Sequence, residues 1–452
     1  MSDLDSLAAS GATAAHDPAV LARTTLRKLT IRLLPFLFVL YIVAWLDRVN
    51  VGFAALQMNA DLQFGPAAFG FGSGIFFLGY CLFEVPSNIV LHRIGARRWI
   101  ARIMVTWGAI SVAMMSVRTP LHFYVLRFLL GVAEAGFFPG VIYYLGLWYP
   151  GEQRARAIAA FMMAIPVAGV VGGLVSGALL GLDGLHGLAG WQWLFLLEGL
   201  PALLLGIVVL MYLTDRPEDA RWLAAPEREW LLRKLAAERS ACSSAHRIGT
   251  FAALRNATVW HLGTIFLLVN IGFYGYTMWS PLVIESLTGF SAAGVGLVTG
   301  AISAVTIVVM LLNGAHSDLT GERPLHVAIP VLVMSAGFLG AASAQSPAPT
   351  LLSLALVPVA LGAAYGPFWS MPSRFLTGEA AACGIAMVNT IVNLGGFIGP
   401  TLIGVLKDRT GTYTTAFVLL GAFAALASLL AFRLRGAAEL RDPTPAVAGS
   451  QP

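Results

Sequence analysis

Long apolar stretches alternate with short polar ones along almost the whole chain. A helix needs about 20 apolar residues to cross the hydrocarbon core of a bilayer. The pattern therefore predicts an all-α membrane protein, and it contains enough apolar stretches for twelve spans. These stretches cover approximately residues 33–56, 67–91, 97–117, 121–146, 155–180, 192–213, 259–285, 292–315, 325–344, 349–370, 382–406 and 414–435.

One long polar segment divides the twelve spans into two sets of six. The predicted domains are a tail at 1–32, a six-helix bundle at 33–213, a linker at 214–258, a second six-helix bundle at 259–435 and a tail at 436–452. Inside the linker, the pattern around 226–239 predicts an amphipathic helix on the membrane surface. A linker helix that joins the two halves explains this segment more simply than a regulatory site does.

Composition supports a membrane protein and argues against other classes. Soluble domains carry about 25% charged residues, whereas this chain carries 11% and is 58% hydrophobic. Its net charge of +5 is spread over short segments between apolar runs, so we expect no nucleic-acid partner. The cysteines at positions 81, 242 and 383 have no metal-binding or redox spacing, and we expect neither a metal nor another cofactor.

The basic residues predict the orientation of the chain in the membrane. If the N-terminus is cytoplasmic, 23 of the 28 lysines and arginines fall in cytoplasmic segments, 3 fall outside and 2 lie within spans. Cytoplasmic loops carry an excess of Lys and Arg. Both termini are therefore predicted to be cytoplasmic.

The two halves contain a repeated loop. The pattern Asn88-His92-Arg93-Gly95-Arg97 after the second span returns 226 residues later as Gly314-Asp318-Leu319-Gly321-Arg323 after the eighth. Repeated halves are typical of transporters, in which the substrate site lies near the membrane midplane between them. We therefore expect two pseudo-symmetric bundles that face each other.

The spans, the central linker and the loop at Gly314–Arg323 together resemble the major facilitator superfamily. Within it, the chain resembles the anion:cation symporter family. The motifs that carry this resemblance are Leu46–Asn50, Glu84–Asn88, His92–Arg98, Arg127–Gly140 and Gly190–Phe195. The resemblance implies a monomeric carrier in a bacterial inner membrane, with substrates such as tartrate, phthalate, hydroxyphenylacetate or sugar acids.

The resemblance also assigns a gating role to the two repeated loops. In the first loop the candidates are Arg93, Gly95 and Arg97, and in the second they are Gly314, Asp318 and Arg323. The first loop departs from the superfamily pattern, because Asn88 and His92 stand where Gly and Asp are usual. We therefore expect the standard charged latch only in the second loop.

Four charged residues lie well inside the predicted spans: Asp47, Arg48, Arg127 and Glu134. Each costs roughly 2.5–3.5 kcal/mol at the centre of a membrane helix, so a partner or a function is needed. Arg127 and Glu134 share one helix face with Gly131, which leaves a gap for a neighbouring helix or a substrate. Asp47 and Arg48 are adjacent and point about 100° apart.

This quartet has a structural and a functional interpretation. Structurally, Asp47–Arg127 and Arg48–Glu134, or the crossed pairs, form salt bridges, although such pairs are weak evidence for stability. Functionally, the family resemblance makes Asp47 and Glu134 proton-coupling residues and Arg48 and Arg127 contacts for the substrate's anionic group. Burial favours the protonated carboxyl and a nearby arginine favours the charged one, so anion binding to the arginine would promote protonation.

Other polar and aromatic side chains in the spans are candidates for lining a cavity. The predicted substrate contacts are Tyr80, Tyr274, Trp369 and Asn393, and further candidates are Trp279, Phe368 and Asn389. Asn393 is favoured because an amide in a span needs a partner inside the bundle. For Glu84 and Glu198, near the ends of their spans, a structural role is the simpler interpretation.

The favoured function is proton-coupled symport of a small organic anion by alternating access. An organic-anion exchanger and a sodium-coupled carrier remain open as alternatives. No G-x-S-x-G elbow, P-loop or H-E-x-x-H motif is found, so we do not expect an enzyme. A sensor usually has a soluble output domain, and neither the tails nor the linker is long enough to form one. A channel does not suit the repeated halves. The sequence does not choose among the organic acids.

Overall fold

The structure is a computed structural model that describes residues 18–242, 257–371 and 379–439. The predicted tails and linker extend in part over 1–17, 243–256 and 440–452, which lie outside the described residues, as does 372–378. Twelve helical segments in the described part are long and apolar enough to cross a membrane. The prediction of an all-α chain with twelve spans is therefore confirmed.

The N-terminal half contains six spans, two of which are broken into pairs of helices. They are α2 (Pro18–Asp61), α3 (Pro66–Ile94), α4 (Ala96–Ala113), α5 (Pro120–Glu134) with α6 (Phe137–Trp148), α7 (Gly151–Met162) with α8 (Ala164–Leu179), and α9 (Gly190–Tyr212). Short 3-10 turns follow at η1 (Met114–Ser116), η2 (Leu180–Leu182), η3 (Leu185–Gly187) and η4 (Pro217–Asp219).

The C-terminal half contains the other six spans, and a helix of the linker precedes it. The linker helix is α10 (Ala225–Cys242). The spans are α12 (Ala257–Thr288), α13 (Ala292–Thr320), α14 (Pro324–Ser343), α15 (Pro347–Ser370), α17 (Glu379–Thr410) and α18 (Thr414–Glu439).

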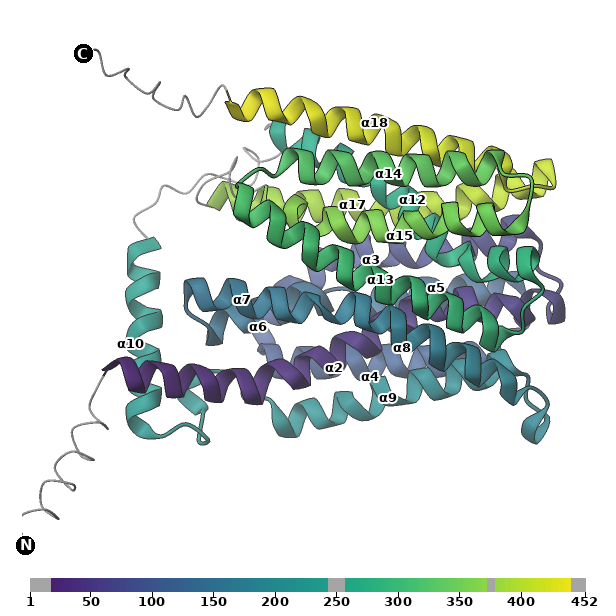
Figure 1. The fold of residues 1–452 in the computed structure, drawn as a ribbon. Helices are drawn as coiled ribbons and strands as arrows, with labels where there is room; N and C mark the ends of the chain where they lie inside the picture. The colour runs from purple at the N-terminus through teal and green to yellow at the C-terminus, as the bar shows by residue number, and fades with distance from the viewer. Residues whose placement is uncertain (1–17, 243–256, 372–378, 440–452) are drawn as a thin grey trace, which may run out of the picture.

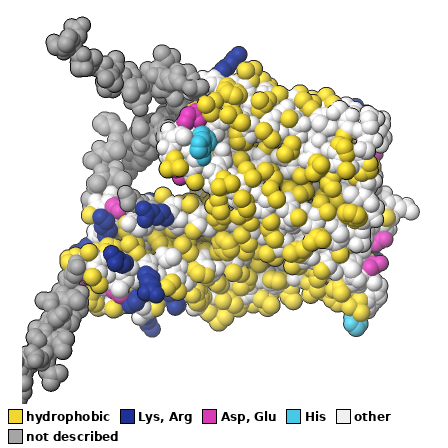
Figure 2. All heavy atoms as spheres, in the orientation of Figure 1, with side chains coloured by type: hydrophobic (Ala, Val, Ile, Leu, Met, Phe, Trp, Pro, Cys, Tyr) yellow, Lys and Arg dark blue, Asp and Glu magenta, His cyan; other side chains and the backbone are white. Residues whose placement is uncertain are grey.

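Helix α10 marks one end of the bundle. Figure 1 shows it across the end at which α2 begins and α18 finishes, and we call this the α10 end and the opposite one the far end. In Figure 2, apolar side chains cover the flank of the bundle and Lys and Arg side chains gather at the α10 end. An apolar flank between polar ends is what a lipid bilayer requires.

Helix α2 begins at Pro18, although the sequence predicted a tail as far as residue 32. The part of α2 that precedes residue 33 is held by tertiary contacts, which the pattern of apolar residues does not reveal. Lys28 pairs with Glu227 of α10 at 2.7 Å, and the Arg32 guanidinium lies over the rings of Tyr212 and Trp222. Helix α10 covers the segment in which the pattern predicts an amphipathic helix.

The two halves touch closely at the far end through small residues. A Cβ on Gly70 of α3 would lie 3.0 Å from Gly404 of α17, and one on Gly173 of α8 would lie 2.9 Å from Gly300 of α13. Small residues let membrane helices approach closely. The far end is therefore closed in this structure.

Replacing Gly173 with leucine should prevent this closure. The side chain would meet the Gly296 carbonyl oxygen, 2.6 Å from the Cβ position, and overpacking costs about 1–3 kcal/mol. That cost disfavours the closed state by about 5- to 150-fold, so we expect uptake in liposomes to fall. Gly181→Leu, at the same end with open space around it, is the control. Equal uptake by both variants would show that closure does not need this contact.

Candidate functional site

Arg48 and Glu134 form a buried ion pair between α2 and α5. Arg48 Nε donates to Glu134 Oε1 at 2.6 Å, and its Nη2 lies 2.5 Å from the same oxygen. Arg48 is 6% exposed and Glu134 is fully buried. Of the pairings considered from the sequence, this one is present.

Aromatic rings surround the Arg48 guanidinium. Its central carbon lies 4.9 Å from the ring centroid of Tyr80, 5.8 Å from Phe76 and 5.9 Å from Trp45. An arginine over an aromatic face is favoured electrostatically, and more so when water is excluded. Tyr80, predicted as a substrate contact, thus lies directly beside the Arg48 guanidinium.

Asp47 points in a different direction from Arg48, as adjacent helical residues must. Its carboxylate accepts hydrogen bonds from Trp107 Nε1, from Ser111 Oγ at 2.6 Å and from Asn50 Nδ2 at 3.2 Å. Trp107 and Ser111 lie on α4. Within the described residues Asp47 has no ion-pair partner, so the Asp47–Arg127 and crossed pairings are wrong.

Arg127 is a buried cation with spare hydrogen-bond donors. It has no accessible surface, and Nη2 donates to the Ser73 carbonyl oxygen at 3.2 Å. Its Nε and Nη1 atoms have no partner among the described residues. The Arg127 and Arg48 guanidinium groups flank the same ring, that of Phe76, and Arg127 lies 4.9 Å from its centroid.

The gap that Gly131 leaves between Arg127 and Glu134 is filled by a helix. A Cβ on Gly131 would lie 2.9 Å from the Phe76 carbonyl carbon and 3.0 Å from the Tyr80 nitrogen of α3. Of the two predicted occupants, a neighbouring helix or a substrate, the structure shows the helix. This close packing brings Tyr80 of α3 next to the charged face of α5.

The fourth span breaks immediately after Glu134, which the sequence analysis did not predict. Helix α5 ends there, and Gly136 adopts a left-handed conformation with φ of +88°. Freed backbone groups must find partners inside a membrane. Ser87 Oγ donates to the Ala135 carbonyl oxygen at 2.6 Å and accepts from Trp99 Nε1 at 3.0 Å. Gly136 and Pro139 inside an apolar stretch were the available signal.

A cavity of about 140 Å³ lies between the two halves. The N-terminal half contributes α2, α7 and α8, and the C-terminal half contributes α12, α13 and α15. Its aromatic wall consists of Trp45, Phe53, Phe273, Tyr274, Tyr276 and Tyr365, and its polar side chains are Asn270, Thr277, Ser280, Thr299, Ser303 and Thr306. Trp45 joins the cavity to Arg48. Tyr274 was predicted, whereas Asn270 and Tyr365 were missed.

Two further predicted contacts, Trp369 and Asn393, lie outside the wall of this cavity. Trp369 packs in an aromatic group with Phe266, Phe368 and Tyr365. Asn393 of α17 is buried, with 7% of its surface exposed. Neither residue lines the cavity in the described part of the chain.

A second contact between the halves involves Glu84 and Asn389. Asn389 Nδ2 of α17 donates to Glu84 Oε1 of α3 at 2.9 Å. Cys81, one turn earlier on α3, lies 3.8 Å from the Thr390 carbonyl oxygen. Glu84 therefore links the two halves through its side chain.

The first repeated loop has a different polar arrangement from the second. Asp215 accepts from the Arg97 backbone nitrogen at 2.9 Å and pairs with its side chain at 3.4 Å. Gly95 has φ of +98°, and a Cβ there would lie 3.0 Å from Asp215. His92, in place of the usual Asp, packs edge-on against Tyr143, and Arg93 is exposed.

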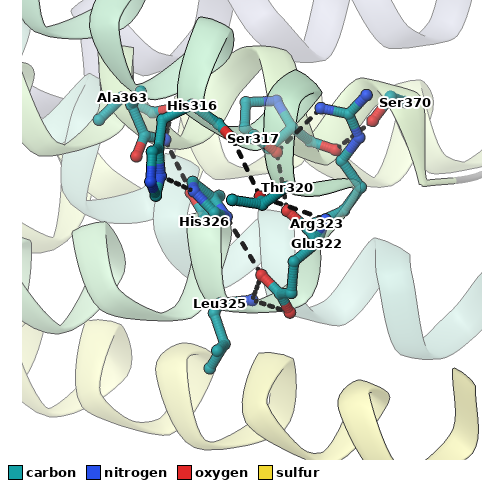
Figure 3. A network of polar contacts seen from close by, with 11 residues as sticks. His316, Ser317, Thr320, Glu322, Arg323, Leu325, His326, Ala363 and Ser370 are labelled. Atoms are coloured by element: carbon teal, nitrogen blue, oxygen red, sulfur yellow. Dashed lines mark hydrogen bonds and ion pairs between the residues drawn. The ribbon is translucent and has the colours of Figure 1, made fainter. Parts of the chain in front are cut away.

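In the second loop, Arg323 pairs with Asp318 at 2.6 Å, and its Nη1 donates to Ser317 Oγ at 2.9 Å. Figure 3 shows Arg323 beside Ser317, with Glu322 reaching His326. Gly314, which lies on α13 with Ser317 and Asp318, has open space around it. The Asp318 side chain is 72% exposed and that of Arg323 is 17% exposed, so water screens the acidic partner, and solvent-screened pairs stabilise a fold by only about 0–1 kcal/mol. The pair is thus weak enough to break during a conformational change.

Twelve spans in two halves that close against each other at one end, with buried charges inside the N-terminal half, define a secondary transporter. The chain belongs to the Major Facilitator Superfamily, because the model of that family matches residues 37–400. It is accordingly a multi-pass membrane protein.

Several relatives are similar over nearly their full length. The chain is 48% identical to the "Putative tartrate transporter" of Agrobacterium vitis over 90% of each chain. It is 39% identical to the "Quinolone resistance transporter" of Acinetobacter baumannii, covering 88% of this chain and 92% of that one. It is 36% identical to the inner membrane transport protein RhmT of Escherichia coli K12, covering 90% and 95%.

Solved structures share the fold at low sequence identity. A bacterial homologue of the human lysosomal transporter Spinster, in an inward-facing and occupied conformation, gives a TM-score of 0.75 at 18% identity over 91% of this chain and 98% of that one. A D-xylose–proton symporter gives 0.72 at 15% identity over 89% and 97%. These matches establish the fold alone.

Proposed function

We propose that this protein is a proton-coupled symporter of a small organic anion. It works as a monomer in a bacterial inner membrane with both termini cytoplasmic. The observation that carries the proposal is the buried Arg48–Glu134 pair with the incompletely bonded Arg127 beside it. In this orientation the closed far end faces outward, so the structure corresponds to the inward-facing half of an alternating-access cycle.

The two arginines form the anion site. Arg48 lies next to the cavity wall at Trp45 and receives the anionic group first. Arg127 supplies two nitrogens, Nε and Nη1, that have no hydrogen-bond partner among the described residues, and a guanidinium binds a carboxylate bidentately. Because Arg127 has no accessible surface here, the anion reaches it only after the surrounding helices move.

Proton coupling follows from competition for Arg48. The anion and Glu134 both need this guanidinium, and an anion that takes it leaves Glu134 without its cation. A carboxylate without a cation in an apolar interior is costly, and protonation removes that cost. Anion binding therefore favours proton binding at Glu134, and by reciprocity proton binding favours the anion. Asp47 is the second proton-coupling residue, and it carries protons only together with Glu134.

The cavity limits the size of the substrate. An apolar cavity of about 150 Å³ holds one benzene molecule, and this cavity of about 140 Å³ is lined by aromatic rings together with hydroxyl and amide groups. It suits a single small ring or a short hydroxylated chain. Two relatives carry the name "Putative tartrate transporter", and tartrate belongs to the second type.

Accumulation of labelled acids in liposomes separates the coupling modes. We expect a pH gradient alone to drive accumulation, and a protonophore to abolish it. A sodium gradient or an internal counter-anion should have no such effect. Accumulation that resists the protonophore but requires sodium or a counter-anion would replace symport with one of the two alternative mechanisms.

A further inference from the structure

A polar pocket lies at the α10 end, separate from the cavity between the two halves. Its volume is about 650 Å³, and its wall is formed by α2, the start of α4, the end of α9, η4 and the start of α10. Four arginines line it: Arg32, Arg97, Arg221 and Arg228. None of these arginines binds the anion in the proposed function.

Most of the charged side chains in this wall have no partner of opposite charge. Asp215 is already occupied, because it accepts from the Arg97 backbone nitrogen and pairs with the Arg97 side chain at 3.4 Å. Five other charged groups of the wall make no ion pair in the described part of the chain: Arg32, Arg221, Arg228, Glu218 and Asp219. Charges of both signs therefore remain available to a ligand.

Arg32 is held by aromatic rings rather than by an acid. Its guanidinium carbon lies 4.7 Å from the ring centroid of Tyr212 and 5.0 Å from that of Trp222. Both rings are anchored, because the Tyr212 hydroxyl donates to the Arg32 carbonyl oxygen at 3.0 Å and Trp222 Nε1 donates to Thr214 Oγ1 at 3.3 Å. Arg32 Nε is buried without a hydrogen-bond partner among the described residues. Stacking uses the face of a guanidinium and leaves the donors in its plane for an oxygen acceptor.

The pocket lies where the polar end of the bundle meets its apolar flank. Met211 belongs to the pocket wall and is 73% exposed, and Ile207 and Leu210 on the same helix are also exposed. On α2, Ile31 is exposed immediately before Arg32. Figure 2 shows the basic side chains of the α10 end beside the apolar flank. Lipid head groups meet hydrocarbon at this level of a bilayer, so a ligand with a charged head and apolar tails contacts both surfaces.

The signs of the unpaired charges define the head group. The three arginines match the oxygens of a phosphodiester, because guanidinium groups bind phosphate through paired N–H donors. Glu218 and Asp219 repel an anion that carries no other charge, so the ligand also needs a cation. A primary ammonium supplies that cation together with three N–H donors. A trimethylammonium group carries the same charge but has no N–H to donate.

We propose that this pocket binds the head group of one phospholipid that carries a primary ammonium. The phosphate lies at the three unpaired arginines, and the ammonium lies at the two unpaired acids. The acyl chains lie against the exposed apolar side chains of α9. The lipid then joins α2, α9 and α10 at the corner where the linker helix begins. This site does not rest on the proposed function, because it involves neither the arginines nor the acids of the transport cycle.

Native mass spectrometry of the purified full-length protein measures this binding directly. Dioleoyl phosphatidylethanolamine, phosphatidylcholine and phosphatidylglycerol share their acyl chains and differ in head group, and we expect one phosphatidylethanolamine to bind more tightly than either other lipid. An arginine beside an anionic lipid group contributes about fivefold in affinity, so Arg221→Gln/Arg228→Gln should lose about 25-fold. Arg233→Gln removes an arginine of α10 that pairs with Glu229 and lies outside the pocket, and it should bind normally.

The two acids provide a second test of the head group. Glu218→Gln/Asp219→Asn should abolish the preference for phosphatidylethanolamine over phosphatidylglycerol. Equal affinity of the wild type for the three lipids, or unchanged binding by Arg221→Gln/Arg228→Gln, would overturn the proposal. Binding of inorganic phosphate with no preference among the lipids would assign the pocket to free phosphate instead, and the lipid would be wrong.

Discussion

Arg127→Gln is expected to weaken binding of the transported anion about 30- to 4,000-fold. Removing one partner of a buried, hydrogen-bonded charge pair costs about 2–5 kcal/mol, which corresponds to that range of affinities. Two nitrogens of the fully buried Arg127 have no partner among the described residues, so its donors are available to an anion once the surrounding helices have moved. Calorimetry on purified protein measures the affinity.

A conservative variant and a control show whether the loss of affinity is specific to Arg127. Arg127→Lys keeps the charge but loses the planar pair of donors, and we expect its affinity to lie between those of the wild type and Arg127→Gln. Arg98→Gln removes an exposed arginine and should bind normally. Wild-type affinity in Arg127→Gln, with the protein folded, would remove Arg127 from the anion site.

Glu134→Gln is expected to abolish accumulation driven by a pH gradient while exchange of internal for external anion continues. Glutamine is neutral, as protonated glutamic acid is, so the carrier can bind the anion but cannot release a proton. The change also leaves the buried Arg48 without its anion, which costs about 3–5 kcal/mol. The unfolding temperature of Glu134→Gln should therefore be lower than that of the wild type. Added anion should raise the unfolding temperature of the variant by more than it raises that of the wild type.

Glu285→Gln is the matched control for Glu134→Gln. Glu285 lies in a span near the far end, has no ion pair in the described structure and should tolerate the change in both assays. Accumulation against a gradient by Glu134→Gln at the wild-type rate would show that Glu134 carries no proton. Loss of exchange as well would place Glu134 in anion binding instead.

The sequence was sufficient to predict the twelve spans, because their length and apolarity report directly on the bilayer. It also identified the four buried charges, since each is costly enough to stand out. It did not show which charges meet. Counting around a helix places Asp47 about 100° from Arg48, but it does not say which neighbour each one faces.

The missed features depend on contacts between distant segments. Asp47 is held by Trp107 and Ser111 of α4, a packing arrangement that no local pattern encodes. Tyr365 and Asn270 line the cavity because α12 and α15 meet α2 there. Asn270 is an amide inside a span, which is the feature that favoured Asn393 as a substrate contact. The same reasoning applied to Asn270 would have identified a residue of the cavity wall.

The most direct test of proton-coupled anion transport uses liposomes with a pH-sensitive dye inside and labelled acid outside. Tartrate, phthalate, hydroxyphenylacetate, galactonate and gluconate form the panel. The proposed function predicts that one class of acid enters together with protons, so that the lumen acidifies in proportion to uptake, and that Glu134→Gln abolishes the acidification. Uptake of an acid by the wild type without any acidification would contradict proton symport.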